Sequence, residues 1–210
     1  MSKERKVFFI YTILIAVLVI VGFSLLYISK SPQKYYLVAR VYIFIEFSIL
    51  AYFFSLHISN KSAKKVLLFT PVIFLLFCIS DFYLEKKPGM PFLPVSVAHI
   101  TLLCFIVYYF FEVMRETVIE PIYQKAIFWI SVAFIINSSG NFFLFLYARY
   151  SYDANVFKTP QYTIIYTTVT IIKNLLLCIS ILIREKKPDP SSSEFLDIDL
   201  DSFHLIKNQK

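Results

Sequence analysis

Two charged residues, Glu46 and Lys173, lie where the surrounding sequence is apolar. Each stands near the middle of a run of roughly twenty apolar residues, a length that crosses a lipid bilayer as a helix. An ionisable side chain at that depth costs about 2.5–3.5 kcal/mol to insert, so it usually faces the interior of a helical bundle and has a partner. If the two helices touch, an ion pair between Glu46 and Lys173 would relieve both penalties, with Asn137 as a hydrogen-bonding neighbour.

Further polar side chains follow at helical spacing. Lys173 shares a helix face with Thr170 and Asn174, and Asn137 lies one turn before Asn141, with small residues between them that permit close helix approach. We therefore predict an intramembrane polar layer that consists of Glu46, Asn137, Asn141, Thr170, Lys173 and Asn174. A purely structural ion pair explains the two charges equally well, and helix adhesion explains the amides better than a substrate pathway does.

The composition fits lipid as the solvent. Of the 210 residues, 58% are hydrophobic and 17% are charged. In soluble proteins about a quarter of all residues are charged. The net charge of +7 comes from Lys and Arg residues at the ends of apolar runs, unlike the basic surface of a nucleic-acid-binding protein. Cysteines and histidines lack metal-binding spacing, so we expect no metal and no other cofactor.

We predict an all-α fold, a polytopic transmembrane bundle of about six helices within residues 1–187. The first apolar run follows basic residues as a signal peptide would, but it is too long and has no small-residue cleavage site, so we interpret it as a retained helix. Short loops make successive helices antiparallel neighbours. The predicted spans are 7–28, 36–58, 66–84, 93–114, 126–147 and 162–183.

The basic residues that flank the spans predict the orientation, because cytoplasmic flanks are richer in Lys and Arg. Eleven lie on the side of the termini: Lys3, Arg5, Lys6, Lys61, Lys64, Lys65, Arg115, Lys125, Arg184, Lys186 and Lys187. Six lie on the other side: Lys30, Lys34, Lys86, Lys87, Arg149 and Lys158. We therefore expect a multi-pass protein of the cell inner membrane with both termini in the cytoplasm. Arg40 lies inside the outer end of its helix, where its long side chain could snorkel outward, and we interpret it as a structural residue.

Residues 188–210 have the proline, serine and aspartate content of a disordered acidic cytoplasmic tail. Apolar residues alternate there with aspartates, a pattern that can add a strand to the sheet edge of a cytosolic partner. Simple disorder is the alternative. The candidate partner-binding residues are Phe195, Leu196, Ile198, Leu200 and Phe203.

Two stretches resemble a family of small, uncharacterised multi-pass membrane proteins of Bacteroidota. The helix that contains Tyr42, Glu46 and Phe47 resembles the Y-x-x-x-E-F helix of the family. The segments 128–130 and 139–145 resemble its F-W-I … S-G-N-x-F-x-F signature, which includes Gly140. Members of the family resemble proteins encoded beside two-component histidine kinases, and the resemblance implies a signalling role.

The chain departs from this family in three respects. It lacks one leading span, it has Asn137 where an aromatic residue is usual, and it carries Lys173 in the last helix. The second and third departures fall on the predicted polar layer, so the resemblance implies no specific role for that layer.

We expect a non-enzymatic sensory or regulatory protein whose partners are the lipid bilayer and a cytosolic signalling protein, with no nucleic acid. The alternative is a channel or ion-coupled transporter in which Glu46, Asn137 and Lys173 line the path, an arrangement that a homo-oligomer would favour. A lipid-modifying enzyme would need an acid–base cluster near the headgroups. Glu112, Glu116 and Glu120 are the candidates, and a solvated helix end explains them more simply.

Overall fold

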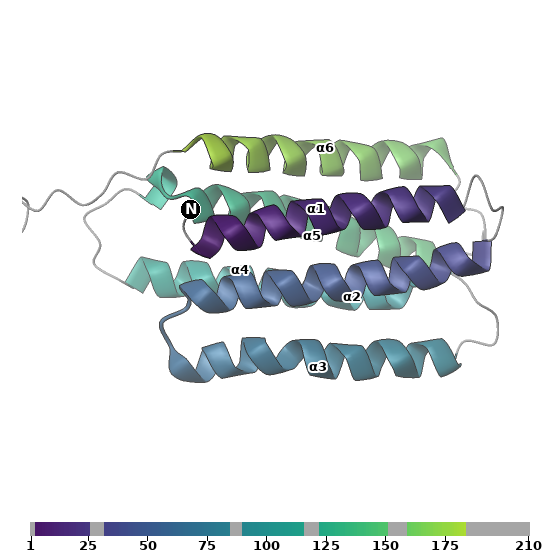
Figure 1. Ribbon diagram of the computed structural model, residues 1–210, viewed down its shortest axis with the longest axis horizontal. Coiled ribbons are helices and arrows are strands. Elements are labelled where there is room, and N and C mark those ends of the chain that lie inside the picture. The colour runs from purple at the N-terminus through teal and green to yellow at the C-terminus, as the bar shows by residue number, and fades with distance from the viewer. Residues whose placement is uncertain (1–2, 26–31, 85–89, 116–121, 151–158, 184–210) are drawn as a thin grey trace, which may run out of the picture.

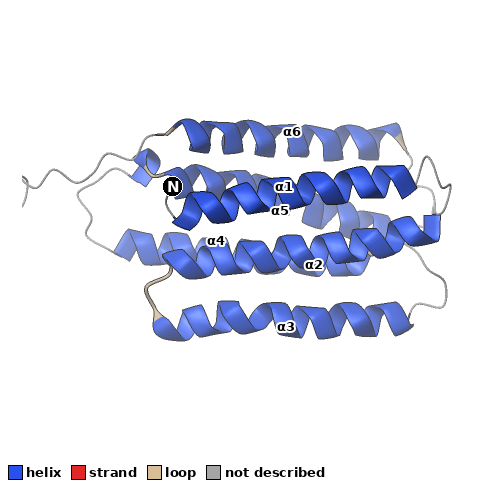
Figure 2. Cartoon of the chain, viewed as in Figure 1, coloured by secondary structure: helices blue, strands red, loops and turns tan. Residues whose placement is uncertain are grey.

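The computed structural model describes residues 3–25, 32–84, 90–115, 122–150 and 159–183. Antiparallel helices form a single bundle (Figure 1). No strand occurs within these described ranges (Figure 2). The helices are α1 (Lys3–Phe23), α2 (Pro32–His57), α3 (Lys61–Leu84), α4 (Phe92–Arg115), α5 (Ala126–Tyr150) and α6 (Pro160–Leu182), with a short 3-10 turn, η2 (Ile122–Gln124), before α5.

The predicted all-helical architecture is confirmed for the described part of the chain. A helix satisfies its backbone N–H and C=O groups within the segment, which is the condition for burial in lipid. In α1 the apolar segment Tyr11–Gly22 is shorter than the other apolar helices. The predicted tail, residues 188–210, lies outside the described residues. Among the described residues, five helices are long and apolar enough to cross a membrane: Lys34–His57, Lys61–Leu84, Phe92–Arg115, Ala126–Tyr150 and Pro160–Leu182.

Polar residues set the starts of two helices. Thr159 caps α6, because its side chain accepts a 3.4 Å hydrogen bond from the backbone N–H of Tyr162, and Pro160 follows at the first helical position. Asn60 acts in the same way before α3, where its Oδ1 accepts the backbone N–H of Ser62 at 2.9 Å. Each cap satisfies a backbone donor that the helix itself leaves free.

The helices divide between the centre and the edge of the bundle. α2 packs against α1, α3 and α4, while α5 packs between α4 and α6. Only 22% of the apolar window of α3 and 11% of that of α6 is buried. Large side chains such as Phe69 and Ile73, both 66% exposed, therefore face the surroundings. Apolar faces of this extent suit contact with lipid.

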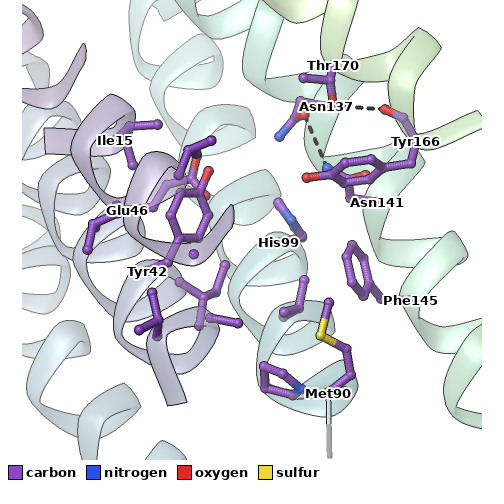
Figure 3. Close-up of a pocket in the computed structure, with 18 of the residues that line it drawn as sticks. Ile15, Tyr42, Glu46, Met90, His99, Asn137, Asn141, Phe145, Tyr166 and Thr170 are labelled. Atoms are coloured by element: carbon purple, nitrogen blue, oxygen red, sulfur yellow. Dashed lines mark hydrogen bonds between the residues drawn. The ribbon is translucent and has the colours of Figure 1, made fainter. Parts of the chain in front are cut away.

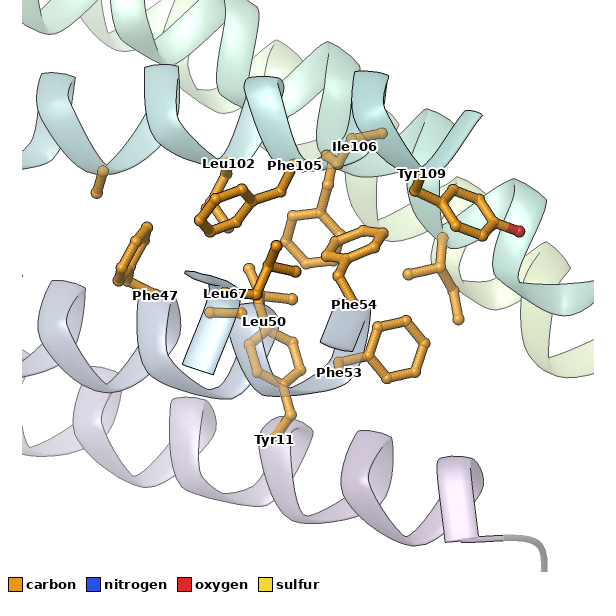
Figure 4. Packing of buried hydrophobic residues seen from close by; sticks show 14 of the residues in the cluster. Tyr11, Phe47, Leu50, Phe53, Phe54, Leu67, Leu102, Phe105, Ile106 and Tyr109 are labelled. Atoms are coloured by element: carbon orange, nitrogen blue, oxygen red, sulfur yellow. The ribbon is translucent and has the colours of Figure 1, made fainter. Parts of the chain in front are cut away.

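The start of α1 and the end of α6 lie at the same end of the bundle (Figure 1). We name the half of the bundle at this end the proximal half, and the opposite half the distal half. Most of the buried apolar cluster lies in the proximal half (Figure 4). Phe47 packs there against Phe74 and Phe105, with ring centroids 4.6 and 6.2 Å away. This aromatic packing joins α2, α3 and α4 near the middle of the bundle.

Candidate functional site

The distal half contains a cavity of about 530 Å³ (Figure 3). Its walls come from α1, α2, α4, α5 and α6. The cavity extends from Tyr35 and Pro91, near the distal ends of α2 and α4, to Glu46 and Lys173 halfway along α2 and α6. The two residues singled out by their position in apolar sequence therefore lie at the deep end of one cavity.

All six residues of the predicted polar layer line this cavity: Glu46, Asn137, Asn141, Thr170, Lys173 and Asn174. The periodicity of each helix explains why they gather, since a polar side chain in an apolar helix is most stable when it faces the bundle interior. Glu46 is 4% exposed and Lys173 is 8% exposed. Whether these residues bind a ligand stays a prediction.

The Glu46 carboxylate accepts a hydrogen bond from a residue of α1. Tyr11 Oη donates a hydrogen bond of 2.9 Å to Glu46 Oε1, and both side chains are buried. Tyr42 lies one turn before Glu46 on α2 and also lines the cavity (Figure 3). The carboxylate is thus oriented by a phenol on its proximal side and faces the cavity on its distal side.

The Lys173 ammonium group lies near an aromatic ring. Its Nζ is 5.9 Å from the centroid of Phe134, in a cation–π contact. The same Phe134 ring meets Tyr11 edge to face, with centroids 6.1 Å apart. Tyr11, Glu46, Phe134 and Lys173 therefore form one layer, which we name the floor of the cavity.

Glu46 and Lys173, both of them described, form no ion pair with each other. The reason is the helix arrangement: α6 packs mainly against α5, whereas α2 packs against α1, α3 and α4. The direct pair that we expected if the two helices touched is therefore not formed. The opposite charges instead lie on helices that contribute different walls of the cavity.

The α5 wall carries linked polar groups. Asn141 Nδ2 donates to Asn137 Oδ1 at 3.2 Å (Figure 3). The remaining amide oxygen, Asn141 Oδ1, is buried and has no hydrogen-bond partner among the described residues. Ser138 Oγ lies 3.3 Å from His99 Nδ1 of α4, and His99 also lines the cavity. The wall thus contains an unused acceptor beside a histidine.

The α6 wall approaches α5 closely. A methyl group placed on Gly140 would lie 2.9 Å from Val169 Cγ2, so the glycine permits the helix contact that its sequence segment predicted. Thr170 Oγ1 donates to the Tyr166 carbonyl at 2.8 Å, as hydroxyls in apolar helices commonly do. Tyr166 is 41% exposed, so this wall is only partly covered by protein.

A second buried charged pair lies outside the cavity. Arg40 Nη1 of α2 and Asp81 Oδ2 of α3 are 2.7 Å apart, and the guanidinium lies 5.5 Å from the Phe82 ring centroid. Arg40 does not snorkel outward, because a buried carboxylate at the same depth on the neighbouring helix binds it, an arrangement that agrees with the structural role that we interpreted for this residue. The sequence interpretation did not include Asp81.

The acidic cluster at the proximal end of α4 also differs from its prediction. Glu112 Oε1 accepts backbone N–H groups of Ser59, at 3.0 Å, and Asn60, at 2.8 Å. Glu112 is therefore a ligand of the α2–α3 turn rather than part of a freely solvated helix end. Glu116 and Glu120 lie outside the described residues.

Sequence reasoning missed two residues of the cavity region, His99 and Tyr11. His99 carries a detectable signal, because it is a polar residue in the apolar run of α4. Tyr11 carries none, since tyrosines are frequent in this chain and only the helix arrangement places its hydroxyl on Glu46.

The cavity lining combines groups with complementary binding chemistry. A carboxylate accepts hydrogen bonds, an ammonium group donates them, and amides and hydroxyls do both. Such a lining suits a ligand that has donors and acceptors of its own.

Two sequence predictions have no structural test. The tail residues Phe195, Leu196, Ile198, Leu200 and Phe203 lie outside the described ranges. Likewise, the resemblance to the Bacteroidota family stays a prediction. Comparison of the chain with protein-family models, with curated proteins and with solved structures gave no match.

Proposed function

We propose that this chain is a non-enzymatic, multi-pass membrane protein with a sensory or regulatory role, which responds to a small ligand in its distal cavity. In this proposal α1 is a sixth membrane span. Both termini then lie in the cytoplasm of a bacterium, since the basic residues of the proximal end are more numerous. The distal cavity faces the opposite side of the inner membrane.

The position of the cavity carries this proposal. Phe47, Phe54 and Phe134 lie at or beyond the floor on the proximal side, and each is at most 1% exposed. A conduit would have to continue through these buried rings, and protein interiors leave few voids larger than a water molecule. A binding pocket that ends at the floor requires no such path, so a receptor is favoured over a channel.

The walls suggest how binding would be transmitted. A ligand that touches Glu46 and Lys173 bridges α2 and α6, two helices that do not pack extensively against each other. If α2 and α6 can adopt two arrangements, the ligand would shift the population towards the arrangement that binds it more tightly. Since α6 leads directly into residues 184–210, a shift of α6 would alter what the tail presents to a cytosolic partner.

Cross-linking in native membranes tests this function. Ala39 lines the cavity, so Ala39→Phe fills it, whereas Ala16→Phe adds the same ring at an exposed position outside the lining. We expect a set of proteins to be cross-linked to the unaltered chain and to be absent when residues 191–210 are removed. Ala39→Phe is expected to change their recovery severalfold, and Ala16→Phe is expected to leave it unaltered. Identical sets with and without the tail would refute its role, and no response to Ala39→Phe would refute sensing by the cavity.

One observation favours the alternative, an ion-coupled transporter. The hydroxyl of Tyr11 and the charges of Glu46 and Lys173 make the floor itself polar, as a path for protons or ions would require. A transporter predicts proton or ion flux in proteoliposomes that falls when Glu46→Gln or Lys173→Met is introduced. Our proposal predicts no flux above that of empty liposomes. A homo-oligomer would be needed if a conduit were formed between copies rather than within one.

A further inference from the structure

The distribution of polarity in the cavity identifies the kind of molecule that fits it. The charged groups Glu46 and Lys173 lie at the deep end, midway along their helices. Ile15, Leu18 and Val19 of α1 form an apolar wall. A membrane lipid keeps its charged head at the bilayer surface, so its polarity is opposite to that of this cavity. A small, water-soluble molecule that enters from the distal end matches it.

The charge of the ligand follows from the floor. Glu46 and Lys173 have opposite charges and do not pair with each other, although each is buried at membrane depth. A ligand with one charge would compensate one of them and leave the other unpaired, which is costly in a medium of low dielectric constant. A zwitterion compensates both.

A further group supports an ammonium end on the ligand. Asn141 Oδ1 is buried, faces no hydrogen-bond donor of the described chain, and belongs to a residue that lines the cavity. An ammonium group has three N–H donors and no acceptor, so it can serve both a carboxylate and an amide oxygen. Phenol rings of Tyr42 and Tyr166 also line the cavity, and aromatic faces attract cations.

The size of the cavity sets the size of the ligand. Its volume of about 530 Å³ lies within the usual range of small-molecule sites, about 300–1,000 Å³. A molecule of amino-acid size fits together with several ordered waters, each of which occupies about 30 Å³ in the liquid. The apolar wall leaves room for an uncharged substituent.

We infer that the distal cavity binds an amino-acid-sized zwitterion, with its ammonium group towards Glu46 and Asn141 Oδ1 and its carboxylate towards Lys173. This inference rests on the proposed function, because it names the ligand of the same cavity.

Binding to the purified full-length protein in detergent micelles tests the inference. The probes are the twenty proteinogenic amino acids, each compared with its N-acetyl and its methyl ester derivative, and binding is measured by calorimetry and by thermal unfolding. We expect at least one free amino acid to bind, and both of its blocked forms to bind at least tenfold more weakly. This comparison on the unaltered chain does not depend on any variant being folded.

Charge variants then assign the two ends of the ligand. Glu46→Gln and Lys173→Met are each expected to weaken binding of the free amino acid at least tenfold. In Glu46→Gln, the advantage of the free amine over its N-acetyl form should also disappear. Lys65→Met is the matched control, since Lys65 is exposed at the start of α3. It should bind as the unaltered chain does.

Three outcomes would overturn the inference. Equal binding of a blocked form, or tighter binding of methylammonium or propionate than of every amino acid, would show a ligand with one charge while the receptor function stands. Binding that is unaffected by both charge variants would place the zwitterion elsewhere. Absence of binding by all twenty amino acids would reject the ligand class, and the Ala39→Phe cross-linking experiment would then report on the proposed function separately.

Discussion

The hydroxyl of Tyr11 donates a 2.9 Å hydrogen bond to Glu46 Oε1, and this bond joins α1 to α2 at the level where the cavity meets the aromatic core. α1 packs mainly against α2 in the described chain, so the bond is a specific link from the largely apolar part of α1 that follows its basic start. It also orients the Glu46 carboxylate, whose residue lines the cavity. Anchoring of α1 and orientation of Glu46 therefore depend on the same contact.

Tyr11→Phe is expected to destabilise the bundle by about 1 kcal/mol, since hydrogen bonds within membrane proteins contribute about that amount. Reversible unfolding in mixed micelles measures the change. Tyr83→Phe is the matched control, because Tyr83 is 81% exposed and its loss of a hydroxyl should have no effect. Combined with Glu46→Met, which removes the acceptor, Tyr11→Phe should cost less than it does alone. Equal costs in the two backgrounds would contradict a direct bond.

The Arg40–Asp81 pair predicts a larger effect. Asp81→Asn leaves a buried guanidinium without its counter-ion, and loss of one member of a buried pair costs about 3–5 kcal/mol. The double variant Arg40→Met, Asp81→Leu removes both charges and should recover most of this loss. Unfolding midpoints in mixed micelles report both changes.

Ser80→Ala is the control for this pair, because Ser80 is the exposed neighbour of Asp81 and bonds only within its own helix. If the double variant Arg40→Met, Asp81→Leu were less stable than Asp81→Asn, the ion pair itself would stabilise the bundle. The loss in Asp81→Asn could then not be explained by the unpaired guanidinium alone.

The depth of the polar residues could be predicted from the sequence, but their partners could not. In a membrane helix each residue adds a rise of about 1.5 Å, so a position along an apolar run gives the depth directly. For this reason Glu46, Lys173 and Asn137 were expected at one level, and all three line the same cavity. Which walls they occupy depends on helix neighbours, and only the structure gives these.

Asp81 illustrates what sequence reasoning can still extract. It lies near the distal end of α3 as Arg40 does near that of α2, and these helices are consecutive and antiparallel. An acid and a base at equal depth on such neighbours predict a pair. By contrast, no sequence rule connects Tyr11 to Glu46 across 35 positions.

Glu112 is expected to stabilise the start of α3. Its carboxylate accepts two backbone N–H groups in the turn before this helix, and loss of a helix-capping acceptor costs about 0.5–2 kcal/mol. Glu112→Ala should therefore lower stability by that amount and speed hydrogen exchange at the amides of Ser59 and Asn60. Glu112→Gln retains an acceptor and should have a smaller effect. Unchanged exchange at these two amides in Glu112→Ala would exclude the capping role.

The contact between α5 and α6 depends on Gly140. A Cβ there would lie 2.9 Å from Val169 Cγ2 and 3.1 Å from Val169 Cγ1, distances that require the Val169 side chain or the helices to shift. Overpacking of this kind typically costs about 1–3 kcal/mol, so Gly140→Ala should lower the unfolding free energy by about that amount. Because this contact holds the wall that carries Lys173, the substitution should also weaken ligand binding.

Two variants separate steric crowding from an effect of the backbone. Val169→Ala removes both clashing methyl groups, so it should restore most of the stability of Gly140→Ala. Gly22→Ala is the matched control, since its Cβ would lie 3.7 Å from the nearest atom of Tyr35, an ordinary contact. Alanine is favoured over glycine in a helix by about 0.5–1 kcal/mol, so Gly22→Ala should be neutral or stabilising. If Val169→Ala failed to rescue Gly140→Ala, the close approach of the two helices would not explain the glycine.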